Sequence, residues 1–192
     1  MSHTIYFISH PDVEINPTIP VTQWPLSARG ITRMTTGLQL PWINSITSVY
    51  CSAERKALDG ADILADHLNL QYQVLSDLGE NDRSATGYLK ADEFERTADE
   101  FFTSPDTSIR GWETAQSAQD RIVRTVRHID TIDETSGTIA IISHGAVGTL
   151  LYYALENEPI NRRWDQPGQG GGNFMELRFS PFTHCAWWKP ID

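Results

Sequence analysis

The sequence is short of cysteine and lacks long hydrophobic runs. Its 192 residues hold only two cysteines, Cys51 and Cys185, too few and too far apart for a disulfide framework. Such a composition suits a reducing compartment, so we expect a cytoplasmic location. No apolar run approaches the length of a membrane-spanning helix, and the N-terminus has neither the basic start nor the apolar stretch of a signal peptide. We therefore expect no membrane partner.

Basic residues are also scarce. Lys and Arg total 15 against 25 Asp and Glu, giving a net charge of −10 and an isoelectric point of about 4.9. This balance argues against binding to nucleic acid, although a local cluster of cations can still bind a small anion. The G-x-S-x-G, G-x-x-x-x-G-K-[ST] and H-E-x-x-H motifs are all absent. Asp12 and Glu14 are the only carboxylates available as metal ligands in this region, which is too few to indicate a metal site. We therefore expect neither metal nor cofactor.

The apolar residues that are present follow an alternating pattern of strands and helices. Strands are expected over residues 4–9, 46–51, 70–76 and 137–143, with two late ones within 170–179 and 184–192. Helices are expected within 24–40, 52–70, 112–132 and 144–157, the first capped by Ser27. This alternation predicts a single-domain, doubly wound α/β fold, in which a mostly parallel sheet has helices on both faces.

The stretch 77–111 differs from its surroundings. It is polar, punctuated by Gly and Pro, and contains one short amphipathic pattern around 91–102. We interpret it as a small, cap-like helical insertion over the active-site crevice within the one domain, residues 1–192.

Two of the expected strands end in the same pair of residues. Ser9-His10 closes one apolar run and Ser143-His144 closes another, the second leading into a helix. A lone histidine at a strand end is usually bonded to backbone and has no further role. If these strands are neighbours, however, both imidazoles enter the crevice at the carboxyl ends of the strands, beside a helix N-terminus that favours an anion. The pattern therefore indicates phosphoryl transfer through a phosphohistidine.

An ordered set of motifs resembles the histidine phosphatase (phosphoglycerate mutase-like) superfamily over most of the chain. Where that family has Arg-His-Gly, this sequence has Ser9-His10-Pro11, with an Asn six residues after the histidine. The family's Leu-Thr-x-x-Gly, Ser-Ser-Pro-Leu-x-Arg-Ala and Leu-x-Glu segments are matched by residues 26–30, 51–57 and 78–80. A Gly-Glu-Ser stretch followed by an arginine is echoed at 111–113 and 121, and Ser-His-Gly is unaltered at 143–145.

The resemblance implies a role for each matching residue. His10 would attack phosphorus, His144 and Lys56 would stabilise charge on the phosphoryl oxygens, and Glu80 would act as general acid and then base. For Glu80 the alternative is a solvated loop carboxylate. The other expected phosphate-binding residues are Asn16, Ser9, Gly145, Arg55 and Arg83. The partner would be a phosphorylated small molecule, and a homodimer is possible.

Three departures fall on the expected phosphate pocket. Ser9 replaces the family's first arginine, Lys56 its second, and Pro11 its glycine, so two bidentate guanidinium groups and one backbone N–H are lost. Either Arg83 or Arg29 supplies the missing charge, or the protein is a weak enzyme or an inactive phospho-ligand-binding protein. We favour a phosphomonoester hydrolase. A phosphoglycerate-type mutase is less favoured because it must hold a second phosphate position.

Overall fold

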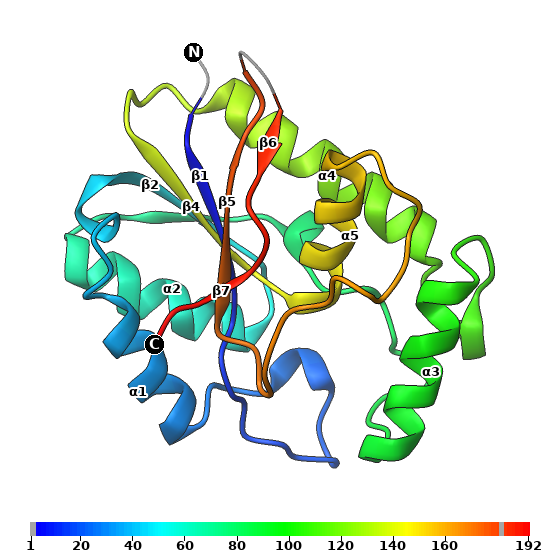
Figure 1. Cartoon of the computed structure of the whole chain (residues 1–192). Coiled ribbons are helices and arrows are strands. Elements are labelled where there is room, and N and C mark those ends of the chain that lie inside the picture. Colours follow the sequence, from blue (N-terminus) through cyan, green and yellow to red (C-terminus); the bar gives the residue numbers. More distant parts are fainter. Residues whose placement is uncertain (1–2, 181–182) are drawn as a thin grey trace.

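The computed structural model describes residues 3–180 and 183–192, which form a seven-stranded sheet flanked by helices (Figure 1). The strands are β1 (Ile5–Ser9), β2 (Ile46–Cys51), β3 (Tyr72–Val74), β4 (Thr138–Ser143), β5 (Asn173–Arg178), β6 (His184–Cys185) and β7 (Lys189–Pro190). The sheet order is β3-β2-β4-β1-β5-β6, with β7 also paired to β5. Strands β1 to β4 run parallel, whereas β5 is antiparallel to β1, and β6 and β7 are antiparallel to β5.

Five α-helices connect and cover these strands. They are α1 (Ala28–Gly37), α2 (Arg55–Leu68), α3 (Ala91–Thr103), α4 (Ala115–Ile132) and α5 (Gly145–Leu155). Four short 3-10 turns lie at Val21–Gln23, Ile43–Ser45, Ser76–Leu78 and Ile109–Gly111. Among the residues that the structure describes, no helix is long and apolar enough to cross a membrane.

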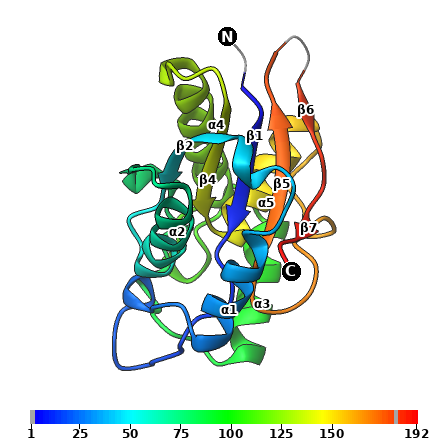
Figure 2. The ribbon, with the colours of Figure 1, turned by 90° about the vertical axis from the view of Figure 1, so that its left-hand side faces the viewer.

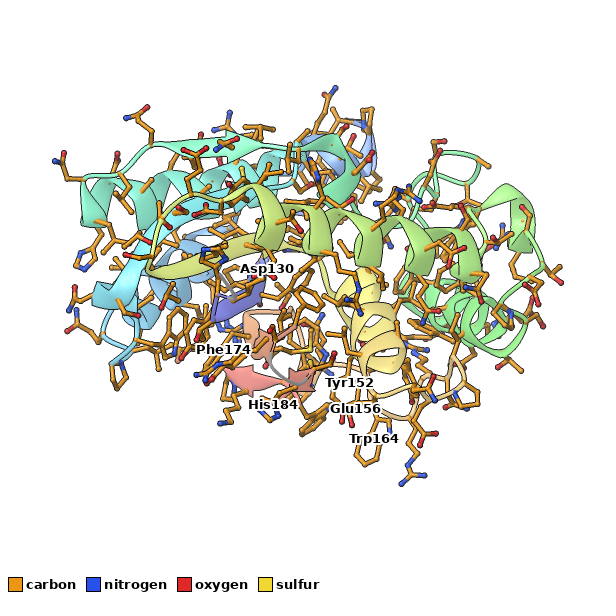
Figure 3. The ribbon with its side chains drawn as sticks, turned by 90° about the horizontal axis from the view of Figure 1, so that it is seen from above. Asp130, Tyr152, Glu156, Trp164, Phe174 and His184 are labelled. Atoms are coloured by element: carbon orange, nitrogen blue, oxygen red, sulfur yellow. The ribbon has the colours of Figure 1, made fainter. Side chains whose placement is uncertain are left out.

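The two faces of the sheet carry separate apolar cores. Successive side chains of a strand point to opposite faces, and in β1 Ile5 and Phe7 pack with α4 and α5. Tyr6 and Ile8 of the same strand pack on the other face, which α1 and α2 cover (Figures 1 and 2). Viewed from above, α5, which carries Tyr152 and ends just before Glu156, lies next to β6, which begins at His184 (Figure 3).

Local interactions fix the chain that follows β1. The Ser27 hydroxyl accepts a hydrogen bond from the Gly30 N–H at 3.1 Å, which caps α1 as the sequence predicts. Gly30 is required here because a Cβ at this position would lie 2.1 Å from the carbonyl oxygen of Asp12. The start of α1 is thus packed directly against the loop that follows His10.

The structure confirms the α/β fold with a mostly parallel sheet and helices on both faces. The boundaries are tighter than the sequence predicts: the expected strand 70–76 is confined to Tyr72–Val74, and the late strands form an antiparallel edge with short β6 and β7. Residues 77–111 contain α3, which lies toward the end of the sheet to which β1 runs (Figure 1).

Candidate active site

The carboxyl ends of β1 and β4 bring two histidines together. Ser9 and Ser143 are paired in register, and the backbone N–H of His10 donates to the Ser143 carbonyl at 3.0 Å. The imidazoles of His10 and His144 then lie with their ring centroids 5.1 Å apart and their planes inclined by 71°. The repeated Ser-His ending therefore does converge on one place at the edge of the sheet.

One ring nitrogen of His10 is fixed by the backbone. Its Nδ1 lies 2.9 Å from the carbonyl oxygen of Pro11, and because a carbonyl only accepts, Nδ1 carries the proton. Burial, with the nearby charges of Lys56 and Arg83, lowers the pKa of His10 to about 4 despite the opposing effects of the Pro11 carbonyl and Glu54. The ring is neutral at pH 7, and its Nε2 keeps a lone pair, which is the form that a nucleophile requires.

His144 is fully buried and differently held. Its Nε2 lies 2.8 Å from the Ser52 hydroxyl and 3.4 Å from Glu54 Oε1, while its Nδ1 is buried without a hydrogen-bond partner. Burial lowers the pKa of His144 well below its usual value, against the opposing effect of the Glu54 carboxylate. A buried polar atom without a partner among the described residues is unusual, which makes this ring nitrogen a candidate to bond a ligand atom.

Lys56 is 2% exposed and already has an ionic partner. Its ammonium group donates to the Val21 carbonyl at 2.9 Å and forms an ion pair with Glu54. Burial lowers the pKa of Lys56, although Glu54 opposes this effect.

Burial alone would raise the pKa of Glu54, but His144, Lys56 and the N–H of Glu80 lower it to about 2. Glu54 was not identified from the sequence, because it stands where the family motif has leucine.

Glu80 lies at the N-terminus of α5. Its carboxylate accepts hydrogen bonds from the backbone N–H groups of Ala146 and Val147, each at 3.1 Å. Burial raises the pKa of Glu80 and Glu54 adds to this effect, while Arg83 and the N–H donors oppose it. Glu80 is therefore half-buried and hydrogen-bonded to the start of α5, which distinguishes it from a solvated loop carboxylate.

A second ion pair holds the loop that carries Glu80. Arg121 of α4 binds the Glu113 carboxylate at 2.8 Å and also donates to the carbonyls of Asp77, Gly79 and Glu80. The stretch that echoes the family's Gly-Glu-Ser motif thus supports Glu80 from outside the site.

A cavity of about 660 Å³ opens in front of these residues. Ser52, Glu54, Glu80 and Arg83 contribute to its lining, together with the loop 17–22 and the segment 79–88. His10 and His144 are not among the described residues that line it, although His144 contacts the lining residue Ser52 and His10 lies next to His144. The other candidate cation, Arg29, is 71% exposed and lies 3.4 Å from Asp12. Of the two arginines, Arg83 is the one that lines the cavity.

The position of the family's first arginine is filled by a neutral cluster. The buried Ser9 hydroxyl lies 2.7 Å from Gln166 Oε1 and accepts from the Asn173 N–H at 3.0 Å. Asn173 Nδ2 also donates to Gln166 Oε1, at 3.2 Å, so the amide of Gln166 is oriented with its oxygen toward Ser9. A Cβ at Gly145 would lie 2.0 Å from Gln166 Nε2, which places this donor against the start of α5. Gln166 was not identified from the sequence.

Two expected phosphate-binding residues lie elsewhere. Asn16 is exposed, its amide oxygen accepts from the Thr18 hydroxyl at 2.7 Å, and it is not among the described residues that line the cavity. Arg55 is 61% exposed and binds Asp59 one turn along α2.

In residues 3–180 and 183–192, no group of three or more His, Cys, Asp or Glu side chains is placed to hold a metal ion.

Comparison with known proteins places these features in a family context. Residues 5–181 match the family model described as histidine phosphatase superfamily (branch 1). A mycobacterial glucosyl-3-phosphoglycerate phosphatase is 16% identical, with a TM-score of 0.80 and coverage of 99% of this chain and 100% of that one.

Two further solved structures have the same fold. A putative alpha-ribazole-5'-P phosphatase from Escherichia coli is 19% identical, with a TM-score of 0.73 and coverage of 98% and 97%. A phosphoserine phosphatase from Entamoeba histolytica is 15% identical, with a TM-score of 0.78 and coverage of 97% and 96%. A search of curated protein sequences found no significant match.

Proposed function

The chain belongs to the histidine phosphatase superfamily of phosphatases and mutase-like enzymes, and we propose that it hydrolyses small phosphate monoesters through a phosphohistidine at residue 10. The observation that carries this proposal is the hydrogen bond between His10 Nδ1 and the Pro11 carbonyl, which leaves the Nε2 lone pair available. Similar structures include phosphatases named for glucosyl-3-phosphoglycerate and phosphoserine, which supports a small phosphorylated metabolite as substrate.

The proposed reaction has two steps. In the first, His10 Nε2 forms a bond to phosphorus while the P–O ester bond breaks, and the Glu80 carboxyl protonates the departing alcohol. In the second, a water molecule attacks phospho-His10, the Glu80 carboxylate takes its proton, and the N–P bond breaks to release inorganic phosphate. The raised pKa of Glu80 supports the first role because it keeps more of the carboxyl in its acid form.

Several donors are available to stabilise the phosphoryl oxygens. Arg83 and Lys56 supply positive charge. The Nδ1 of neutral His144 is a donor in the tautomer whose Nε2 accepts from the Ser52 hydroxyl. We assign Gln166 Nε2 to the place of the missing arginine because its amide is oriented by Ser9 and lies against Gly145. Gly145 supplies the first backbone N–H of α5, where anions are favoured.

The alternative is a catalytically weak or inactive phospho-ligand-binding protein. Two observations favour it: the Glu54 carboxylate neutralises Lys56 within the site, and neither histidine is among the described residues that line the cavity. A mutase is less favoured because a second phosphate position would need further cations. Cytoplasmic location, metal independence and a homodimer stay predictions from the sequence.

A panel of phosphate monoesters tests the proposal. Purified protein should release inorganic phosphate from at least one member, and His10→Ala should abolish this release. The matched control is His128→Ala, since His128 is exposed on α4. Binding of phosphate esters without any His10-dependent release would overturn the hydrolase and support the binding protein.

A further inference from the structure

A second cavity adjoins the catalytic one. It has a volume of about 280 Å³ and shares the lining residues Val21, Arg83, Gly87 and Tyr88 with the catalytic cavity, so the two lie side by side. The second cavity is therefore within reach of a molecule whose phosphate group lies in the first.

The walls of this second cavity are largely apolar. They include Ile15, Trp24, Leu89 and Phe94 in addition to Val21 and Tyr88. The indole N–H of Trp24 donates to the Asn16 carbonyl at 2.8 Å, so its polar atom is satisfied, and its ring centroid lies 5.9 Å from that of Tyr88. Aromatic rings of this kind offer apolar contact area to a ligand.

The charged groups in the second cavity are few. Among the described residues that line it, only Arg83 and Glu95 are of a charged type. Glu95 is paired with Arg162 at 2.6 Å. The Arg83 guanidinium lies over the Phe94 ring, 5.0 Å from its centroid, and also faces the catalytic cavity. A substrate with a carboxylate next to its phosphate would have to share this one cation.

Two of the wall residues expose apolar surface that a ligand would cover. Ile15 is 59% exposed and Tyr88 is 38% exposed, which is more than most large apolar side chains of this chain. Covering such surface favours binding in proportion to the apolar area removed from water.

We propose that this second cavity binds the apolar part of the alcohol esterified to phosphate, so that the substrates are alkyl or aryl phosphates. This inference rests on the proposed hydrolase activity. The second cavity should favour an apolar leaving group. The similar phosphatases are named for more polar compounds, such as glucosyl-3-phosphoglycerate and phosphoserine.

A series of n-alkyl phosphates from ethyl to octyl tests it. The pKa of the leaving alcohol is nearly constant along this series, so a change in rate reports on binding of the chain. We expect kcat/KM to rise roughly two- to fourfold per added methylene until the cavity is filled. Hydrolysis with no rise along the series would overturn the inference and leave the hydrolase intact.

The matched variants are Ile15→Ser and Ile31→Ser. Ile31 is 47% exposed on α1 and does not line the second cavity, so Ile31→Ser should keep the dependence on chain length. Ile15→Ser should reduce the gain per methylene. An equal reduction in both variants would contradict the assignment.

Binding of n-alkylphosphonates, measured by calorimetry, separates this inference from the hydrolase proposal. Affinity should rise with chain length even if none of the alkyl phosphates is hydrolysed. Affinity that is independent of chain length would overturn the apolar site whatever the activity.

Discussion

His10 and His144 face one another at the ends of two adjacent parallel strands, with ring centroids 5.1 Å apart. Burial lowers the pKa of both imidazoles, to about 4 for His10. The pair therefore enters the reaction neutral at pH 7, with one ring held by a backbone carbonyl and the other by Ser52 and Glu54.

Glu80→Gln should lower kcat by roughly a hundred- to ten-thousand-fold, because the variant cannot donate or accept the proton of the reaction. In the unaltered enzyme, kcat/KM should fall on the acid side as His10 is protonated near its pKa of about 4. On the alkaline side it should fall as Glu80 loses its proton at its raised pKa. A pH profile of both proteins checks this, and an alkaline limb that persists in Glu80→Gln would contradict the role.

Glu54→Gln should strengthen binding of inorganic phosphate by about tenfold or more, since it removes a negative charge from the pocket and leaves Lys56 for the ligand. The same change should lower the thermal midpoint without phosphate, because a buried ammonium group loses its partner. Calorimetry and thermal unfolding, with and without phosphate, measure both effects. Glu14→Gln, at an exposed position, is the control.

Weaker phosphate binding in Glu54→Gln would mean that the carboxylate is needed to hold the site. The contact of Glu54 with His144 would then affect phosphate binding more than its negative charge does.

Ser9→Arg should destabilise the protein by about 1 to 3 kcal/mol, because the larger side chain displaces the buried contacts with Gln166 and Asn173. The double variant Ser9→Arg/Gln166→Gly should recover stability and bind phosphate at least tenfold more tightly, since a guanidinium group then has space beside Gly145. Urea unfolding and phosphate titration check both steps. A double variant with weaker binding would show that the site is built for a different ligand.

Stability should decrease as the pH falls from 6.5 toward 4. The folded-state pKa of His10 is about 4 against an ordinary value of 6.5, so in this window the unfolded chain binds the proton and the folded one does not. His10→Gln should lose about 2 to 3 kcal/mol less than the unaltered protein between pH 7 and 4.5. Urea unfolding at the two pH values measures the difference, with His128→Gln as control. Equal losses in all three proteins would contradict the lowered pKa.

The histidine pair could be predicted from the sequence because two strands that end alike in a parallel sheet must deliver their next residues to the same edge. Glu80 could be predicted as a site residue from its motif, but its hydrogen bonds to the start of α5 could not. Glu54 could not be recognised, since an acidic residue at the start of a helix usually serves as a solvated helix-end charge. Gln166 is contributed by a loop 157 positions from Ser9, and no local pattern indicates that contact. Asn16 and Arg55 were expected to bind phosphate because they match, or nearly match, positions of the family motifs. Their side chains instead bind Thr18 and Asp59.

The most direct test of the account is detection of phosphate on His10. Protein mixed with a hydrolysed monoester and quenched in alkali, where phosphohistidine survives, should give a phosphorus NMR signal for a phosphoramidate and a peptide mass shift that maps to residue 10. The signal should disappear in His10→Ala. With an activated aryl phosphate, whose leaving group needs no proton from Glu80, it should accumulate in Glu80→Gln, which is slow to activate water. Turnover that continues in His10→Ala, or a phosphoryl group mapped to another residue, would contradict the central claim.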